Sequence, residues 1–430
     1  MGLIGRDPQP DVLRGAGAQP APSCDIAVYN AISGVPAAWD TVAGGSSLFL
    51  GRGYLRLLEA HGPPGLLSRY ALIMRNGVPV AAVRALIFDV DDGMLAVRDR
   101  TEFNAWQRPW GRFLDKGMTW LRNRSLGAFG RRIVLCGNLF SCGLHGVAFA
   151  NGEDPQQLWP AVVDALHRIR DADGQAAYLL IKDFMQPDAG HCRPLLDHGF
   201  ARLQIEPSMD LAVPASWHTH ADYCDSLNAK HRKAMRKIYE AVDRFGAVVE
   251  SGVDPQPEQD RLFELYLQVE HHAQIRFGML QAGYLPALAD MAGPDRFRCS
   301  VIRKGGGIIG FSTVLKDGDT ANAHVLGFDY AANAQAPVYL RLLHQTIEDS
   351  LALGCRTIHY GRTALEPKSR LGATPTDTEI WVKHCQPFVN RVVGRLLRLV
   401  PEDTSPRHQP FRLDRPVVRK SPSGSDRPLS

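Results

Sequence analysis

The spacing of apolar residues divides the chain into stretches with two different periods. Alternating residues and short apolar runs predict β-strands, whereas apolar residues three and four positions apart predict helices. In the first half, Leu158, Val162 and Leu166 share one face and predict an amphipathic helix over 155–171. Shorter helices are expected over 39–42, 54–60 and 192–198, and strands over 25–29, 69–74, 79–88, 132–136, 177–182 and 201–212.

The second half of the chain predicts a similar set of elements. Helices are expected over 227–245, 257–270, 284–292, 337–353 and 389–400, and strands over 247–250, 297–303, 307–316, 320–328, 355–360 and 378–384. Residues 213–225 are expected to form a connector. Asn76-Gly77 is a strong hairpin signal in the first half, and residues 304–306 and 317–318 predict turns in the second.

The two halves repeat one pattern. RYALIMRNGVPVAAVRALIFDVDDG in the first half corresponds to RFRCSVIRKGGGIIGFSTVLKDGDT in the second, and each reads as strand, tight turn, strand and acidic turn. Helix, strand, connection and strand follow in both halves. A repeat of roughly 190 residues is far longer than a solenoid unit and predicts two similar domains side by side. Each domain is expected to be a mixed α/β (α+β) unit with helices on both faces of its sheet.

These patterns suggest how the chain divides. We expect domains over residues 24–212 and 213–400, the second beginning with the connector and a basic helix. Residues 1–23 lack apolar periodicity and are rich in Gly, Pro, Ala and Gln, so they are expected to be a disordered leader. Residues 401–430 are expected to be a disordered tail.

Composition excludes several classes of protein. A hydrophobic fraction of 45% and a charged fraction of 22% are those of an ordinary globular chain, and a net charge of +4 does not by itself point to nucleic acid. The eight cysteines form no C-x-x-C pair, so we expect reduced thiols in a cytoplasm and no metal site. No apolar run reaches about 18 residues, so no membrane-spanning segment is expected.

The stretch HYGRTALEPKSRLG, residues 359–372, carries the main candidate chemistry. An apolar strand ends in Gly-Arg-Thr, and a loop with Glu366, Lys368 and Arg370 is expected to follow. Sheets of α/β proteins bring such side chains to the crevice beyond the carboxyl ends of their strands. The stretch therefore predicts the floor of a site for an anionic or polar ligand, although a surface loop with solvated charges has the same pattern.

The helix expected after the connector is strongly basic. Lys230, Lys233 and Lys237 share a face about 11 Å long, and Arg232 and Arg236 form a neighbouring row. Such a row of cations is either a solvated face or a contact for a pyrophosphate, a nucleotide-linked substrate or a tRNA acceptor stem.

Two other segments each allow two interpretations. The helix over 389–400 carries arginines beside valines and leucines, so it either lies on an anionic membrane surface or caps its own domain. Trp106, Trp110 and Trp120 suit either a hydrophobic acceptor pocket or packing between the domains.

The order of elements resembles the GNAT acyltransferase fold. The basic helix, the strand HVLGFDY (324–330) and the stretch YGRTALEPKSRLG (360–372) make the duplicated chain similar to the tandem FemAB-like and Fem-type peptidyltransferase group. Lys368 looks like the lysine of the Fem-type K-x-x-F-G segment, although Leu371 stands in place of the phenylalanine. The glycine-rich Q-x-x-G-x-G/A turn that cradles the coenzyme A pyrophosphate in typical GNAT enzymes is absent, and DYAANAQAPVY stands in its position.

The resemblance implies roles for individual residues. Glu270 is the preferred general base, and His324 is a second candidate that could equally be a core histidine. Tyr360 could protonate the leaving group or simply pack at a strand end. Residues expected to bind substrate or donor are Arg362, Thr363, Lys368 and Arg370 in the charged stretch and Lys230, Lys233, Arg236 and Lys237 in the basic helix.

The resemblance implies an N-acyltransferase whose second half is active and whose first half is largely structural. The expected donor is acetyl-CoA or another acyl-CoA, and aminoacyl-tRNA is the alternative. The expected acceptor is an amine on a small molecule or a cell-envelope precursor, and peripheral membrane contact is compatible with it. The protein is expected to be a monomer or a dimer. A non-catalytic GNAT-like binding protein is the rival interpretation.

Overall fold

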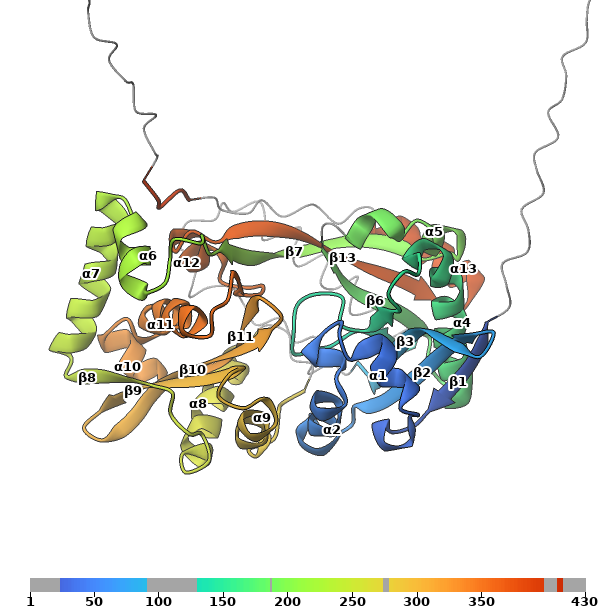
Figure 1. Cartoon of the computed structure of the whole chain (residues 1–430), viewed down its shortest axis with the longest axis horizontal. Coiled ribbons are helices and arrows are strands. Elements are labelled where there is room, and N and C mark those ends of the chain that lie inside the picture. Colours follow the sequence, from blue (N-terminus) through green and yellow to red (C-terminus); the bar gives the residue numbers. More distant parts are fainter. Residues whose placement is uncertain (1–23, 91–129, 186–187, 274–277, 398–407, 413–430) are drawn as a thin grey trace, which may run out of the picture.

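The computed structural model describes residues 24–90, 130–185, 188–273, 278–397 and 408–412 (Figure 1). The tryptophan-rich stretch around Trp106, Trp110 and Trp120 lies outside the described residues. The strands are β1 (Asp25–Tyr29), β2 (Leu67–Arg75), β3 (Val78–Asp89), β4 (Arg132–Cys136), β5 (Val147–Phe149), β6 (Tyr178–Met185), β7 (Ala201–Ala212), β8 (Ala247–Ser251), β9 (Phe297–Lys304), β10 (Gly307–Asp317), β11 (Thr320–Phe328), β12 (Thr357–His359) and β13 (Thr374–His384).

The helices lie between these strands in chain order. They are α1 (Ala38–Ala43), α2 (Arg52–His61), α4 (Pro155–Asp173), α5 (Pro194–Asp197), α6 (His220–Ser226), α7 (Ala229–Arg244), α8 (Gln259–His272), α9 (Tyr284–Ala292), α10 (Tyr330–Gln335), α11 (Val338–Ala352), α12 (Leu365–Arg370) and α13 (Pro387–Leu397). Among the described residues, no helix is both long enough and apolar enough to cross a membrane.

All described strands join one sheet whose order shows the duplication. The order is β1-β2-β3-β4-β6-β13-β7-β12-β11-β10-β9-β8, with β5 beside β3. Neighbours are antiparallel except for the pairs β4–β6 and β11–β12, which are parallel. Read inward from either end, the sheet has an edge strand, three antiparallel strands and one parallel strand. The expected fold class, two similar units of mixed and mostly antiparallel sheet with flanking helices, is confirmed.

The two halves exchange their last strands at the centre of the sheet. β7 belongs to the first half but pairs with β12, and β13 belongs to the second half but pairs with β6. β7 and β13 also pair with each other along most of their length, from Thr374↔Asp210 to Val382↔Ala201. The bounds of the two domains stay a prediction, because residues on both sides of position 212 contribute to each part of the sheet.

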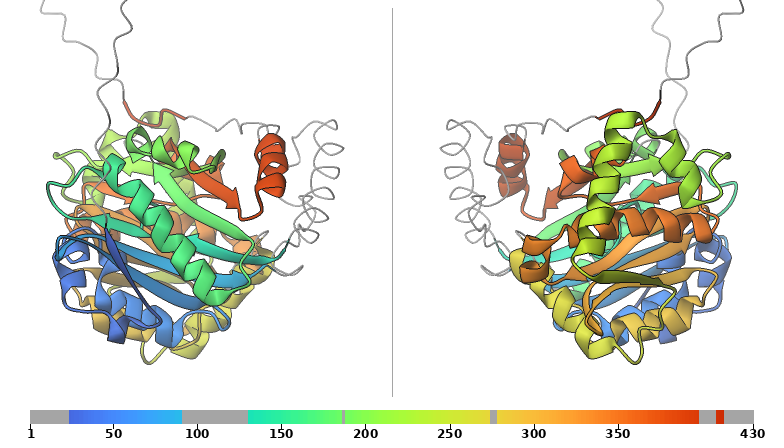
Figure 2. Two further views of the ribbon diagram at one scale, coloured as in Figure 1. Left: turned by 90° about the vertical axis from the view of Figure 1, so that its right-hand side faces the viewer. Right: turned by 90° about the vertical axis from the view of Figure 1, so that its left-hand side faces the viewer.

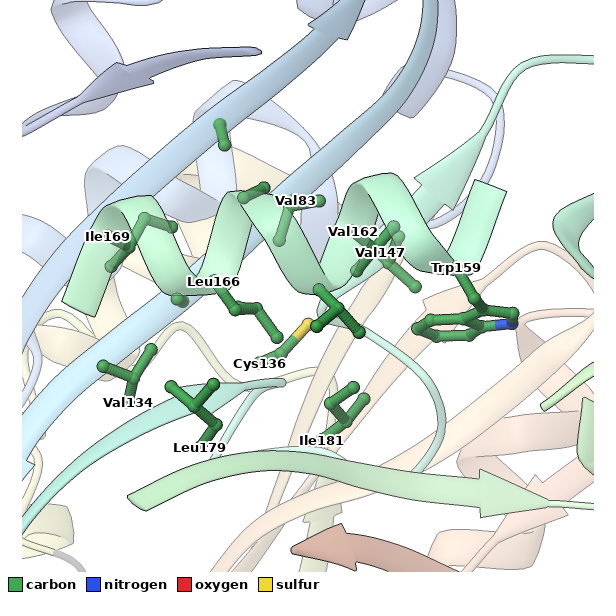
Figure 3. Close-up of a cluster of buried hydrophobic side chains, with 14 of the residues drawn as sticks. Val83, Val134, Cys136, Val147, Trp159, Val162, Leu166, Ile169, Leu179 and Ile181 are labelled. Carbon is green, nitrogen blue, oxygen red and sulfur yellow. The ribbon is translucent and has the colours of Figure 1, made fainter. Parts of the chain in front are cut away.

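Helices cover both faces of this sheet and bury its apolar positions (Figure 2). In the first half, α4 lays Val162, Leu166 and Ile169 on β3, β4 and β6, as Figure 3 shows. The opposite face packs against α1 and α2. In the second half, α8 and α9 cover one face and α11 covers the other. The spacing of apolar residues predicted α4, α8 and α9 because each buries a single stripe, whereas α11 is buried on most of its sides.

Three short helices were not expected from the sequence. The connector over 213–225 contains most of α6, which begins with a capping box between Thr219 and Asp222. The expected loop after Gly361 is wrong, since residues 365–370 form α12 after two left-handed residues, Thr363 and Ala364. α10 is preceded by its N-cap Asp329, whose carboxylate accepts two backbone N–H groups.

Gly327 on β11 permits a close approach of α8 to the sheet. A Cβ atom at this position would lie 2.5 Å from a ring carbon of Phe311 and 2.6 Å from backbone atoms of Leu265 and Tyr266. We expect Gly327→Ala to lower the free energy of unfolding by about 2 kcal/mol through overpacking. Urea unfolding measures this loss.

Gly45→Ala is the matched control, because a Cβ at the exposed Gly45 would meet no atom within 4 Å. Equal stability of the two variants would show that α8 can move away from β11 without cost.

Candidate active site

β11 and β12 pair for only three residues and then diverge. The parallel register runs from Thr320↔Thr357 to Asn322↔His359. Beyond Asn322, β11 continues beside β10 to Phe328, whereas the chain after His359 follows β7, with Tyr360 N donating to Met209 O. Polar side chains that meet at this divergence of β11 and β12 form the candidate site.

The side chains of three neighbouring strands reach the same face of the sheet here. Leu211 on β7 and Ile358 on β12 pack toward α11, so the next residues, Asp210 and His359, point to the opposite face. His324 on β11 also points to that face, because it contacts Tyr284 of α9. These positions follow from strand alternation once the pairing is known.

A β-bulge adjusts the position of His324. Ala323 pairs with Val314 and Leu326 pairs with Ser312, so His324 and Val325 together stand opposite the single residue Thr313. The Thr313 hydroxyl accepts from the Val325 N–H at 2.9 Å and donates to the Val325 carbonyl at 2.8 Å. Bulges of this kind re-aim side chains and are common beside active sites.

His359 and Asp210 form a hydrogen-bonded pair at the end of β12. His359 Nδ1 lies 2.6 Å from a carboxylate oxygen of Asp210, which also accepts from the Ser208 hydroxyl at 2.8 Å. Burial alone would raise the pKa of Asp210, but the hydrogen bonds from His359, Thr376 and Ser208 lower it on balance. A carboxylate that holds Nδ1–H leaves Nε2 as the basic atom of the ring.

A loop from the first half reaches the same place. The insertion loop (residues 137–146), which follows β4, lies between the two halves in Figure 1. Its Phe140 packs into the apolar cluster of α8 and α9, and its Cys142 Sγ lies 3.9 Å from Arg362 Nη2. Ser141 Oγ lies 2.6 Å from His145 Nδ1, and the His145 ring stacks on Phe49. Burial, aided by the nearby Lys182 and His359, lowers the pKa of His145 to about 3.

Arg362 crosses from the second half to a buried carboxylate of the first. Its Nη2 donates to both oxygens of Asp183 at 2.7 and 2.9 Å, and Asp183 also pairs with Lys182. Burial would lower the pKa of Arg362, but Asp183 raises it on balance. Asp183 is fully buried and has a φ of 64°, and Thr363 has a φ of 65°. Strained backbone of this kind clusters at functional sites.

Lys368 holds the turn that precedes α12. It is only 5% exposed, and its Nζ donates to the carbonyls of Arg362 at 2.7 Å and Gly361 at 3.3 Å. Burial lowers its pKa to about 8. In the part of the chain that the structure describes, the contacts of Lys368 are therefore with its own backbone turn, and they fix the position of Arg362.

The structure places the other residues predicted for the site in different surroundings. Tyr360 lies in the core, where its hydroxyl donates to the Leu343 carbonyl and burial raises its pKa well above the usual range. Thr363 N donates to Glu206, and Arg370 pairs with Glu366 on the surface. Glu270 lies near the end of α8. Burial raises the pKa of Tyr266, and the nearby charge of Glu270 raises it further.

The tail contributes a short segment to this region. Residues 408–412 lie against α12 and α6, with His408 Nε2 2.9 Å from Glu366 and His408 N donating to Ser369. Phe411 packs against Gly372, which has a φ of 101° and no room for a side chain. These contacts hold α12, and with it Lys368, in place.

The basic helix α7 keeps most of its cations exposed. Lys230, Lys233, Arg236 and Lys237 are exposed, and no carboxylate of the described residues lies within 4 Å of them. Arg232 differs, because its guanidinium donates to the carbonyls of Leu227 and Asp225 and so caps α6.

The starts of α10 and α11, which follow β11, do not fit a coenzyme A pyrophosphate. The Asp329 carboxylate already accepts from the N–H groups of Ala331 and Ala332, and the Asn333 side chain accepts from Tyr339 N at 2.9 Å. A pyrophosphate would need such amides free, and a carboxylate beside it would repel it.

The pair of His359 and Asp210 was not identified from the sequence. His359 could have been suspected, since it ends a strand directly before the Gly-Arg-Thr corner. Asp210 lies 149 residues earlier and reaches His359 only because β7 pairs with β12. No local signal marks that pairing.

The lowered pKa of Lys368 predicts a stability change with pH. In the unfolded chain the lysine binds its proton up to about pH 10.5, whereas the folded protein loses it near pH 8. Raising the pH between these values therefore stabilises the wild type relative to Lys368→Met, by about 2 kcal/mol between pH 7 and 10.

Urea unfolding of both proteins at several pH values tests this expectation, and contributions of all other groups cancel in the difference. A difference that stays constant from pH 7 to 10 would mean that Lys368 is solvated in the folded protein.

Residues 229–369 match the family model described as Acetyltransferase (GNAT) domain. A comparison with curated proteins gives no match.

Similar solved structures include FemX, with 10% identity and a TM-score of 0.49 over 80% of this chain and 93% of that chain. L-PGS from Bacillus licheniformis has 12% identity and a TM-score of 0.43 over 80% of this chain and 95% of that chain. A tandem GNAT protein from the clavulanic acid biosynthesis pathway has 12% identity and a TM-score of 0.44 over 85% of this chain and 99% of that chain.

The matched residues begin with α7 and end inside α12, so they include the divergence of β11 and β12, with His324, His359 and Arg362. The first half repeats the same strand order without being part of the match. The second half of the chain therefore carries the match to a GNAT acetyltransferase domain, over residues 229–369, and the two halves repeat one strand order.

Proposed function

We propose that the protein transfers an acyl group to an amine acceptor where β11 and β12 diverge. The observation that carries this proposal is the hydrogen-bonded pair of His359 and Asp210 at the end of β12, facing the bulge at His324. An attacking amine must lose a proton, and a histidine oriented by a carboxylate is suited to accept it.

The roles of the neighbouring groups follow from their contacts. His359 Nε2 takes the proton of the attacking amine, and Asp210 keeps the ring oriented and stabilises the imidazolium. Arg362, whose position Asp183 and Lys368 fix, provides positive charge for an anionic part of the donor or acceptor. Glu270 remains a second candidate for the base. Tyr360 has no part in the proposal, because its hydroxyl is bonded in the core.

The donor is either aminoacyl-tRNA or a coenzyme A thioester. Amides at the start of α10 are engaged by Asp329, and an amide at the start of α11 is engaged by Asn333. These contacts favour a donor that is not held there by a pyrophosphate. Aminoacyl-tRNA is therefore our first candidate, and the exposed cations of α7 suit its acceptor stem. Acetyl-CoA or another acyl-CoA is the second candidate, with its pyrophosphate bound elsewhere. Both donors are cytoplasmic compounds, and the proposed acceptor is the amine of a small molecule or a cell-envelope precursor.

Transfer assays test the function and the donor together. The protein is incubated with radiolabelled acetyl-CoA or with charged tRNA, each in the presence of a panel of amines, and label in the amine fraction is counted. Transfer from either donor supports the proposal and identifies the donor. Binding of neither donor would favour a non-catalytic GNAT-like protein.

Replacing the proposed base should remove most activity. We expect His359→Gln to lower kcat by about 100-fold or more, because general base catalysis typically contributes that much. Asp210→Asn should lower kcat by about 10-fold, since the ring stays in place but loses its orienting charge. Steady-state kinetics and thermal melting of each variant separate activity from folding.

His218→Gln is the matched control, since His218 is exposed and lies away from the divergence of β11 and β12. Wild-type turnover in His359→Gln would remove this histidine from the mechanism and return Glu270 to first place.

Reversing charges on α7 should weaken binding of an anionic donor. We expect Lys233→Glu with Lys237→Glu to weaken donor binding at least about 10-fold. If the donor is tRNA, the slope of log affinity against log salt should fall by about 2. Filter binding over a range of salt concentrations measures both quantities.

The matched control reverses Arg56 and Arg193, which are exposed on α2 and beside α5 and change the net charge equally. The same affinity and slope in both double variants would mean that α7 is only a solvated helix.

A further inference from the structure

The Arg362 guanidinium uses one of its three nitrogens in contacts with the rest of the protein. Nη2 donates to the two carboxylate oxygens of Asp183 at 2.7 and 2.9 Å and lies 3.9 Å from Cys142 Sγ. Nε and Nη1 have no hydrogen-bond partner among the described residues, and the side chain is 23% exposed. One hydrogen on Nε and two on Nη1 are therefore available to an oxygen ligand.

The positive charge of Arg362 is only partly compensated. Among the described residues, Asp183 is the one carboxylate within 4 Å of Arg362, and it is fully buried. Asp183 also pairs with Lys182, so one negative charge is shared between two cations. A guanidinium that shares its counterion in this way still attracts an anion.

The other carboxylates near Arg362 have partners of their own. Glu206 accepts from the Thr363 N–H at 3.0 Å, and Asp210 lies 2.6 Å from His359 Nδ1. Burial lowers the pKa of Lys368 to about 8, and the charges of Glu206 and Asp210 oppose this effect. These two carboxylates therefore compensate other groups and leave the free side of the guanidinium open to a ligand.

The backbone holds Arg362 in position before a ligand binds. The Arg362 carbonyl accepts from Lys368 Nζ at 2.7 Å, and the next N–H, that of Thr363, donates to Glu206. Gly361 and Thr363, on either side, have φ values of 69° and 65°. Left-handed backbone at a residue such as threonine costs energy and is retained mainly at functional sites. A cation that is already fixed loses little conformational entropy when it binds an anion.

Arg362 lies close to the proposed base. His359 ends β12 three residues earlier, so the two Cα atoms are at most about 11 Å apart, and its side chain is 22% exposed. The insertion loop borders both residues. Its Cys142 contacts Arg362, and its His145 has a pKa that burial lowers and that Lys182 and His359 lower further. A small molecule at His359 is therefore within reach of Arg362.

The geometry of the reaction decides which substrate lies there. The base contacts the proton of the attacking amine, so the molecule that carries the amine lies beside His359. The lone pair of the amine points away from that proton and toward the acyl carbonyl. The donor must therefore approach from the other side of the amine, and the acceptor is the substrate that lies next to Arg362.

We propose that the acceptor is an amine that also carries a carboxylate or a phosphate, and that Arg362 binds this anionic group while the amine lies at His359. This inference rests on the proposed function. The amine nitrogen forms a bond to the carbonyl carbon, and the bond between that carbon and the leaving group breaks with its electron pair on the leaving group. His359 takes the amine proton and passes it to the leaving group. Arg362 keeps its protons and only positions the acceptor.

The first test detects the anion site without any acyl transfer. Protein labelled with 15N-arginine is titrated with inorganic phosphate and, separately, with acetate, and the Nε–H signals are followed by NMR. The Arg362 signal is identified by its loss in Arg362→Met. We expect this signal to shift in a saturable way, whereas the signal of Arg370, whose Nε donates to Glu366 at 3.0 Å, moves little. No saturable shift at Arg362 with either anion would overturn the inference.

The second test measures which acceptors the enzyme prefers. Transfer to glycine is compared with transfer to glycinamide, and transfer to phosphoethanolamine with transfer to ethanolamine. The preference is the ratio of kcat/KM for the anionic amine to that for its partner. We expect Arg362→Met to lower this ratio at least about 10-fold, because a hydrogen bond between charged groups contributes about that much. Differences in amine basicity cancel between the two proteins, and the pair that responds distinguishes a carboxylate from a phosphate.

The variants include controls for folding and for charge. Arg362→Met leaves Asp183 with Lys182 alone, so Arg362→Met with Asp183→Asn is measured as well, and thermal melting verifies that each variant is folded. Arg193→Met is the matched control, because Arg193 is exposed beside α5. A raised KM for the donor together with an unchanged preference among amines would assign Arg362 to the donor and overturn the inference.

The outcomes separate this inference from the proposed function. Transfer to amines whose preference does not depend on Arg362 would leave the proposed function standing and overturn the acceptor class. Absence of transfer with every donor and amine would overturn the proposed function and, with it, the acceptor class, even if NMR shows an anion on Arg362.

Discussion

The exchange of β7 and β13 between the halves is the constraint on which the candidate site depends. Because β7 crosses to pair with β12, Asp210 comes beside His359. Because β13 crosses to pair with β6, the strand that carries Asp183 lies in the middle of the sheet, close to the corner at Arg362. Two long antiparallel strands that pair with each other also close both halves into one sheet. The two side-chain pairs of the candidate site therefore depend on long-range strand order.

The two halves differ at the point where their parallel strands stop pairing. In the first half, β4 and β6 pair up to Cys136↔Ile181, and the next residue, Lys182, fills the space beyond. Its Nζ donates to the carbonyls of Asn138 and Ser141, and a Cβ on Gly137 would lie 2.3 Å from its side chain. In the second half, the last pair is Asn322↔His359, and His359 lies near His145 of the insertion loop. The first half thus supplies a wall to the site of the second half.

Much of the fold could be predicted from residue spacing, since the long helices bury single stripes and the meanders end in Gly-rich turns. β4, β7 and α9 have the predicted bounds. The short helices were missed because they depend on caps, such as the Asp329 carboxylate before α10, and not on apolar period. The exchange of β7 and β13 was not predicted. The alternation of apolar residues shows which face of a strand is buried, but it does not show which strand pairs with it.

The charged residues of the site show a similar limit. Arg362 and Lys368 were recognised as unusual from their position after a strand and a glycine. Their contacts were not predicted, because a sequence does not show that Asp183 lies opposite Arg362 or that Lys368 donates to two backbone carbonyls. Arg362 and Lys368 both bind groups of the protein itself. The part of the Arg362 guanidinium that does not contact Asp183 remains for a ligand.

His324 and His359 are residues of the same type, but their hydrogen-bond partners differ. A neutral imidazole has one donor and one acceptor, and whichever nitrogen the protein engages decides what the other can do. Asp210 engages His359 through Nδ1–H and leaves a basic nitrogen beside a group that stabilises positive charge. Tyr284 engages His324 at Nε2 in a buried setting, which disfavours positive charge on the ring. Two residues of one type, on adjacent strands and on one face, therefore differ in the charge that their surroundings favour.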